Sequence, residues 1–227
     1  MRTRFEMQLE TLNEEIIGMG ALVEIAMKNA MQALVNGDAE LAQKNIEADK
    51  DIDQKMKDIE SLCLKLLLSQ QPVARDLRLI SAALKMVSDL ERIGDQCADI
   101  SEIVMTFPKG TEAAHLEYIP KMAEAVHKMI SESVDAFVHR DVELARTVVD
   151  FDDVVDRLYD DVRRTLVELV RKDSDAGEGL MDLLLTAKYL ERIGDHAVNV
   201  AKWVIFSVTG TRNGTGFLTG PDEVNDK

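Results

Sequence analysis

Carboxylates spaced four residues apart are the side chains of this 227-residue chain best suited to chemistry. The spacing appears twice in the first half and twice in the second, in Asp49 and Asp53, then Glu91, Asp95 and Asp99, then Asp152 and Asp156, then Glu191 and Asp195. Residues four apart share one helix face, where like charges repel. Unit charges about 4 Å apart repel by roughly 1 kcal/mol in water and by several times that near a protein surface. A bound cation removes this repulsion, because hard metal ions take several oxygen ligands from different elements.

The string Leu-Glu-Arg-Ile-Gly-Asp occurs at 90–95 and again at 190–195, and each copy carries two of these acids. Gly94 and Gly194 therefore lie inside predicted helices, where glycine costs ~1 kcal/mol relative to alanine. Because glycine has no Cβ, it allows a neighbouring helix or the ligands of an ion to come close. Asn199 replaces the third acid of the second copy, which weakens that site but leaves a carbonyl oxygen.

Other interpretations of these acids remain open. An acidic pair is often only a solvated helix face, and Arg92 and Arg192 could neutralise the acids through ordinary ion pairs. Repetition of the whole pattern on corresponding segments favours a metal site. His196 follows Asp195 directly, so it lies about 100° around the helix from the acids and is more typical of a surface or supporting residue than of a ligand. Ligation by oxygen alone suits Mg, Ca, Mn or ferric iron better than structural zinc.

Six long helices are predicted to position these acids, with bounds near 3–35, 38–68, 73–106, 112–138, 141–172 and 179–208. The apolar stripes of the third and sixth match position for position, as Leu90, Ile93, Cys97, Ile100 and Val104 against Leu190, Ile193, Ala197, Val200 and Val204. No segment alternates like a strand. Short turns between long helices predict antiparallel neighbours and therefore bundles.

The predicted fold class is all-α, with two tandem three-helix bundles related by internal pseudo-symmetry. The second helix aligns with the fifth at an offset of 103 residues, and the third aligns with the sixth at an offset of 100. The predicted divisions are 1–108 for the first bundle, 111–208 for the second and 209–227 for a tail that is not helical.

Net charge, cysteine content and hydropathy limit which partners and which cellular compartment are expected for this chain. A net charge of −15 and a pI near 4.7 would repel a phosphate backbone, so nucleic acid is not an expected partner. Cys63 and Cys97 lie in helical patterns without C-x-x-C spacing, so they are predicted to be core residues in a reducing compartment. Residues 1–8 lack a signal-peptide core and no apolar run approaches ~20 residues, so a cytoplasmic protein is expected.

Together these features resemble the PhoU family, the phosphate-specific transport system accessory proteins. The resemblance spans about residues 5–208, and its carriers are the doubled Leu-Glu-Arg-Ile-Gly-Asp, the paired acidic patterns and Gln-Pro-Val-Ala-Arg-Asp-Leu-Arg at 71–78. It implies two three-helix bundles, often a homodimer, and multinuclear iron or zinc clusters held on the surface by the acidic motifs. Carried over, the ligands of one cluster are Asp49, Asp53, Glu91, Asp95 and Asp99, and those of the other are Asp152, Asp156, Glu191 and Asp195.

The resemblance also implies a function. It points to a non-enzymatic negative regulator of the phosphate regulon and of phosphate uptake, which contacts the transporter's ATPase subunit and a sensor histidine kinase. Such a protein would reach the membrane only through its protein partners. The stretch 72–76 has no obvious copy in the second repeat, and it is either a one-sided contact surface or simply a helix start.

Two competing functions follow from the same residues. One is a carboxylate-bridged iron protein with storage or redox enzyme activity, but ferritin-type bundles use a Glu-x-x-His spacing that these motifs lack. The other is a bundle that binds no metal at all. A regulatory adaptor is the favoured hypothesis, because the sequence contains no recognisable nucleophile or nucleotide-binding loop.

Overall fold

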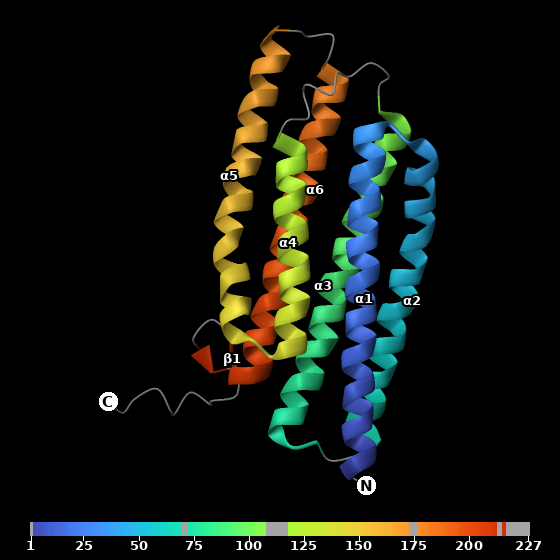
Figure 1. The fold of residues 1–227 in the computed structure, drawn as a ribbon, viewed down its shortest axis with the longest axis vertical. Helices are drawn as coiled ribbons and strands as arrows, with labels where there is room; N and C mark the ends of the chain where they lie inside the picture. Colours follow the sequence, from blue (N-terminus) through green and yellow to red (C-terminus); the bar gives the residue numbers. More distant parts are fainter. Residues whose placement is uncertain (1, 70–71, 108–117, 173–176, 213–214, 217–227) are drawn as a thin grey trace, which may run out of the picture.

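The computed structural model describes residues 2–69, 72–107, 118–172, 177–212 and 215–216, and it is built from long helices (Figure 1). The helices are α1 (Arg2–Asn36), α2 (Ala39–Ser69), α3 (Ala74–Thr106), α4 (Tyr118–His139), α5 (Val142–Lys172) and α6 (Gly177–Thr209). All six predicted helices are thus confirmed. The predicted start of the fourth helix, 112–117, lies outside the described residues.

Two antiparallel three-helix bundles, α1 to α3 and α4 to α6, lie side by side (Figure 1). α3 packs along α6 and α1 packs against α4, so the bundles share one continuous hydrophobic core. The apolar stripes predicted on α3 and α6 are buried in that core. The all-α, two-bundle fold with internal pseudo-symmetry is therefore confirmed. Among the described helices, none is both long and apolar enough to cross a membrane.

The turns between α1 and α2 and between α4 and α5 are built alike. Gly37 and Arg140 both have left-handed backbones, with φ of 63° and 53°. The residue after each donates its N–H back to a carbonyl of the preceding helix at 2.9 Å, in the Schellman pattern that ends helices. Asp38 and Asp141 then cap the next helix, each with a side-chain oxygen that accepts a backbone N–H at 3.0 Å. A non-glycine residue at a left-handed position is uncommon, which makes Arg140 unusual.

After α6 the chain forms a small hairpin, in which β1 (Thr211–Arg212) pairs antiparallel with β2 (Thr215–Gly216). The sequence pattern did not predict any strand, because two-residue strands are too short to show alternation. The start of the predicted tail is non-helical, as expected, and 217–227 lie outside the described residues.

Candidate metal centre

The first acidic cluster joins two helices that are neighbours in space. Asp49 and Asp53 lie on α2 and Asp95 lies on α3, and one carboxylate oxygen from each falls within 4.8 Å of the others. Ligand oxygens on opposite sides of a cation bound at 2.0–2.6 Å would be about 4–5 Å apart. The three oxygens are therefore already at a separation that one cation could bridge, and all three side chains are only half-buried.

Gly94 allows α2 and α3 to approach closely at this point. A Cβ added to Gly94 would lie 2.9 Å from Ile52 Cδ1 and 3.2 Å from Asp49 Oδ1. A side chain at this position would thus press on both the core and a candidate ligand. One turn before Asp49, the buried Asn45 donates hydrogen bonds to Ala26 O at 3.0 Å and Ser101 Oγ at 2.9 Å, which ties α2 to α1 and α3.

Burial and mutual repulsion raise the pKa values of this cluster. The pKa of Asp49 is raised to about 6, first by burial and then by the charges of Asp95, Asp53 and Asp99. Burial is also the main cause that raises the pKa values of Glu91, Asp95 and Asp99. Without a cation the charged state of the cluster is disfavoured, so a divalent ion would replace protons there.

Glu91 and Asp99 do not belong to the close group of three. They lie one turn before and one turn after Asp95 on α3, and both contribute charge to the cluster. Arg92 lies 3.5 Å from Glu91 Oε2 and 3.4 Å from Asp95 Oδ2. The predicted ion pairing by Arg92 is therefore present, but it involves only Glu91 and Asp95 and does not neutralise Asp49 or Asp53.

Asp99 is linked to the other repeat. Burial raises the pKa of the Asp99 carboxyl, while Arg192 and Tyr189 of α6 both act to lower it. Sequence reasoning missed Tyr189 altogether. The only available signal was its position directly before the second Leu-Glu-Arg-Ile-Gly-Asp string.

The second acidic cluster lies between α5 and α6 and is looser. The pKa of Asp152 is raised to about 6, first by burial and then by Asp156 and Asp195, while Lys202 opposes the rise. Lys188 Nζ lies 2.6 Å from Glu191 Oε2. In the described part of the chain, no three acids of this cluster come as close as those of the first. A Cβ on Gly194 would meet Val155 at 3.5 Å and Asp152 at 3.7 Å, which are ordinary contacts.

His196 and Asn199 face α3 and not the second cluster. His196 Nδ1 lies 2.9 Å from Asp89 Oδ1, and Asn199 Nδ2 donates to the same oxygen at 3.4 Å. The sequence-based orientation of His196, away from the acids, agrees with this contact. At the offset of 100, Asp89 with Asn199 is the counterpart of Tyr189 with Asp99, so the pseudo-symmetry extends into the α3–α6 interface.

The two cysteines are not part of any site. Both are fully buried in the core, as the sequence predicted. Burial raises the pKa of the Cys63 thiol to about 12 and raises that of Cys97 as well, so neither is a reactive thiolate or a soft metal ligand.

The fold and its acidic clusters define a class of all-α proteins made of two packed three-helix repeats. The PhoU domain family matches this chain twice, over residues 16–104 and 119–204. The chain belongs to the PhoU family.

Relatives support the assignment over most of the chain. The phosphate-specific transport system accessory protein PhoU homolog of Pseudomonas aeruginosa is 36% identical over 92% of this chain and 86% of its own. The homolog of the same name from Clostridium acetobutylicum is 37% identical over 92% of this chain and 96% of its own.

Solved structures show the same fold. The crystal structure of PhoU from Pseudomonas aeruginosa superposes with a TM-score of 0.85 at 36% identity, covering 91% of this chain and all of that one. The phosphate transport system regulatory protein PhoU from Streptococcus pneumoniae superposes with a TM-score of 0.86 at 27% identity, covering 92% of this chain and 98% of that one.

Proposed function

We propose that this chain is a non-enzymatic, metal-binding regulator of phosphate uptake and of phosphate-starvation signalling. Its relatives are named accessory proteins of the phosphate-specific transport system, and a structural neighbour is named a regulatory protein of phosphate transport. The proposed role is negative regulation of the phosphate regulon, through contact with the transporter's ATPase subunit and a phosphate-sensing histidine kinase. A homodimer in the cytoplasm is part of the same proposal.

The observation that carries the metal-binding part is the group formed by Asp49, Asp53 and Asp95. Three carboxylates from two helices would supply one oxygen each to a cation, and Glu91 and Asp99 on the adjoining turns would supply further oxygens. That arrangement fits a cluster of more than one ion. Iron and zinc are the metals that the family suggests, while Mg, Ca and Mn fit the oxygen-only chemistry equally well.

Elemental analysis tests the metal. The full chain is purified without chelator, supplemented with iron and zinc, and compared with Asp49→Asn/Asp95→Asn. Asp51 is exposed on α2 between the two ligand positions, so Asp51→Asn is the matched control. We expect the double variant to lose at least half of the bound metal and the control to retain all of it. Equal metal content in all three proteins would contradict the proposed site.

A genetic complementation assay tests the regulation. Deletion of the gene should release alkaline phosphatase expression in phosphate-rich medium, and a plasmid copy should restore repression. The same assay with Asp49→Asn/Asp95→Asn then asks whether the metal site takes part in signalling. Unchanged repression after deletion would rule out the regulatory function, whatever the metal content.

An iron-storing or redox enzyme remains the alternative, and the structure offers it little support. The histidine nearest the second cluster, His196, contacts Asp89 on α3 and not the acids. Oxidation of added ferrous iron by the protein, lost in Glu91→Ala, would favour this alternative over the adaptor.

A further inference from the structure

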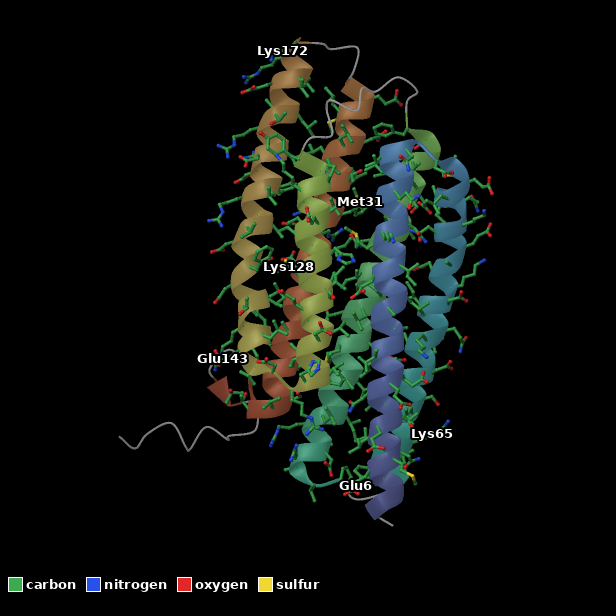
Figure 2. The ribbon with its side chains drawn as sticks, viewed as in Figure 1. Glu6, Met31, Lys65, Lys128, Glu143 and Lys172 are labelled. Atoms are coloured by element: carbon green, nitrogen blue, oxygen red, sulfur yellow. The ribbon has the colours of Figure 1, made fainter. Side chains whose placement is uncertain are left out.

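A cavity of about 280 Å³ lies at the end of the molecule where the two bundles meet, far from the first acidic cluster. Along α3 it is 20 residues, about 30 Å, from Asp95. Its walls come from the start of α3, the α4–α5 turn and the end of α6, as Arg75, Asp76, Leu79, Arg140, Ser207 and Val208. These three segments converge at the lower end of the molecule in Figure 1, and Glu143 marks the same end in Figure 2.

A third arginine, on the same helix as Arg75, is not among the lining residues but packs close to them. Arg78 lies one helical turn after Arg75, and its side chain packs against Gly210, the residue that follows α6. Its Cδ, Nε and Cζ atoms lie 3.5 to 3.7 Å from the position that a Cβ of Gly210 would occupy. Its Nε is buried and has no hydrogen-bond partner. Because a guanidinium keeps its charge at any ordinary pH, it needs an acceptor there.

Among the described residues, none of these three arginines, Arg75, Arg78 and Arg140, forms an ion pair, whereas some of the other arginines do. Among the described residues that line the cavity, Asp76 is the only acid. In a chain with 42 Asp and Glu against 27 Lys and Arg, two arginines without ion pairs in one cavity wall make this wall favourable for an anion.

The start of α3 adds to the positive potential. Val73 occupies the N-cap position and provides no side-chain hydrogen bond. Val73 therefore supplies no capping oxygen to the first N–H groups of α3, which lie next to Arg75 and Asp76. Such a helix start favours an anionic ligand, and here it adds to the guanidinium groups that already line the cavity.

Among the described residues, the counterpart positions at the opposite end of the molecule lack these arginines. Gly37 is the counterpart of Arg140 at the offset of 103, and Glu178 is the counterpart of Arg78 at the offset of 100. Gly37 and Arg140 share the left-handed backbone, which suits glycine and strains arginine. In the described part of the chain the arginines therefore gather at one end, and the stretch 72–76, which has no copy in the second repeat, contributes Arg75 and Asp76 to the cavity wall.

We propose that this cavity is a binding site for a small tetrahedral oxyanion, with inorganic phosphate as its ligand. Guanidinium groups bind phosphate oxygens through paired N–H donors, and an anion here would meet the two arginines of the cavity wall, Arg75 and Arg140. A water molecule takes up about 30 Å³, so the cavity has room for the ion and several waters. The site is separate from the proposed metal centre and does not depend on it.

Isothermal titration calorimetry with inorganic phosphate tests the site at low ionic strength, on chelator-treated full-length protein. Arg140→Gly is the decisive variant, because Gly37 shows that the same turn accepts glycine without strain. It should fold at least as well as the parent and bind phosphate about tenfold more weakly or worse. Arg75→Gln should weaken binding similarly. Arg146→Gln is the control, since Arg146 lies near this end but pairs with Glu143 at 2.6 Å.

The titration of Asp49→Asn/Asp95→Asn separates the two sites. Phosphate binding equal to that of the parent supports the arginine cavity, whereas its loss would place the phosphate at the acidic cluster and overturn the proposal. Saturable binding that Arg140→Gly weakens and Arg146→Gln leaves unchanged supports it, and competition by sulfate supports the same oxyanion class. No saturable binding by the parent, or binding of a phosphopeptide without binding of free phosphate, would overturn it.

Discussion

The two acidic clusters occupy equivalent positions in the two repeats but differ in the charges around them. The first has five carboxylates, and positions 88 and 102 beside it hold serine and glutamate. The second has four carboxylates, and the counterpart positions hold Lys188 and Lys202. Lys188 forms an ion pair with Glu191, and the charge of Lys202 acts to lower the pKa of Asp152.

This difference shows how two equivalent sites of one fold can differ in the negative charge that a bound cation would neutralise. In the second cluster, tethered ammonium groups supply part of the positive charge that an ion would bring. In the first cluster, Arg92 pairs with Asp95 at 3.4 Å and Lys57 lies 3.8 Å from Asp53, yet the three close carboxylates remain within 4.8 Å of one another. We therefore expect metal to bind the first cluster more tightly than the second.

Removal of one carboxylate from each cluster should show the largest effect. Asp95→Asn replaces a charged carboxylate of the close group of three by a neutral amide, so we expect at least ~100-fold weaker metal binding at the first cluster. Asp195→Asn should change total affinity far less, because its cluster is already partly neutralised by Lys188. Competition with a fluorescent chelator measures both. Equal losses would show that the two clusters are equivalent.

The two mid-helix glycines should differ by about 2 kcal/mol in their tolerance of alanine. Gly94→Ala forces a Cβ to 2.9 Å from Ile52, and overpacking of this kind costs about 1–3 kcal/mol, partly offset by the better helix propensity of alanine. Gly194→Ala meets only ordinary contacts and should be neutral or stabilising by up to about 1 kcal/mol. Urea unfolding of the metal-free proteins measures both. A larger loss for Gly194→Ala would reverse the comparison.

Neutralising Lys188 should make the second cluster more like the first. Lys188→Gln leaves Glu191 without its ammonium partner, so we expect metal affinity at the second cluster to rise by about tenfold. Lys128 is a matched control, since it pairs with Glu132 at 3.8 Å and lies 4.6 Å from the Phe151 ring, on α4 in Figure 2. If Lys128→Gln raised the affinity equally, the effect would be general and not local to the cluster.

The smallest expected effect is a pH dependence of the metal-free protein. The pKa values of Asp49 and Asp152 are raised to about 6 in the fold, so the native state binds more protons than the unfolded chain between pH 4 and 6. Stability should therefore fall as pH rises from about 4 through 6, by ~1 kcal/mol for each cluster after solvent screening. Thermal unfolding with chelator at several pH values measures the fall.

Asp49→Asn and Asp152→Asn should each abolish the part of this pH-dependent loss of stability that its own cluster causes. Added metal should abolish the pH-dependent loss due to the first cluster at a lower concentration than the loss due to the second cluster. A stability that rises between pH 4 and 6 in the chelated parent would contradict the sign of both pKa shifts.

Much of this molecule follows from local patterns. The spacing of apolar residues predicted all six helices and the buried stripes on α3 and α6. The doubled Leu-Glu-Arg-Ile-Gly-Asp predicted the two-bundle repeat, and the four-residue spacing predicted which acids share a helix face. These features depend on neighbours three or four positions apart, and helix geometry is the same wherever such neighbours occur.

Contacts between distant segments could not be derived this way. Among the described residues, three of the five acids in the first cluster come close together, Tyr189 of the other repeat acts on the pKa of Asp99, and His196 contacts Asp89. The arginine cavity draws on three segments more than sixty residues apart in sequence. These arrangements depend on how the bundles dock along α3 and α6, and docking is set by the packing of whole helix faces. The periodicity of one helix predicts which of its residues form the apolar face. Which residues of other helices that face contacts is decided only by the three-dimensional packing.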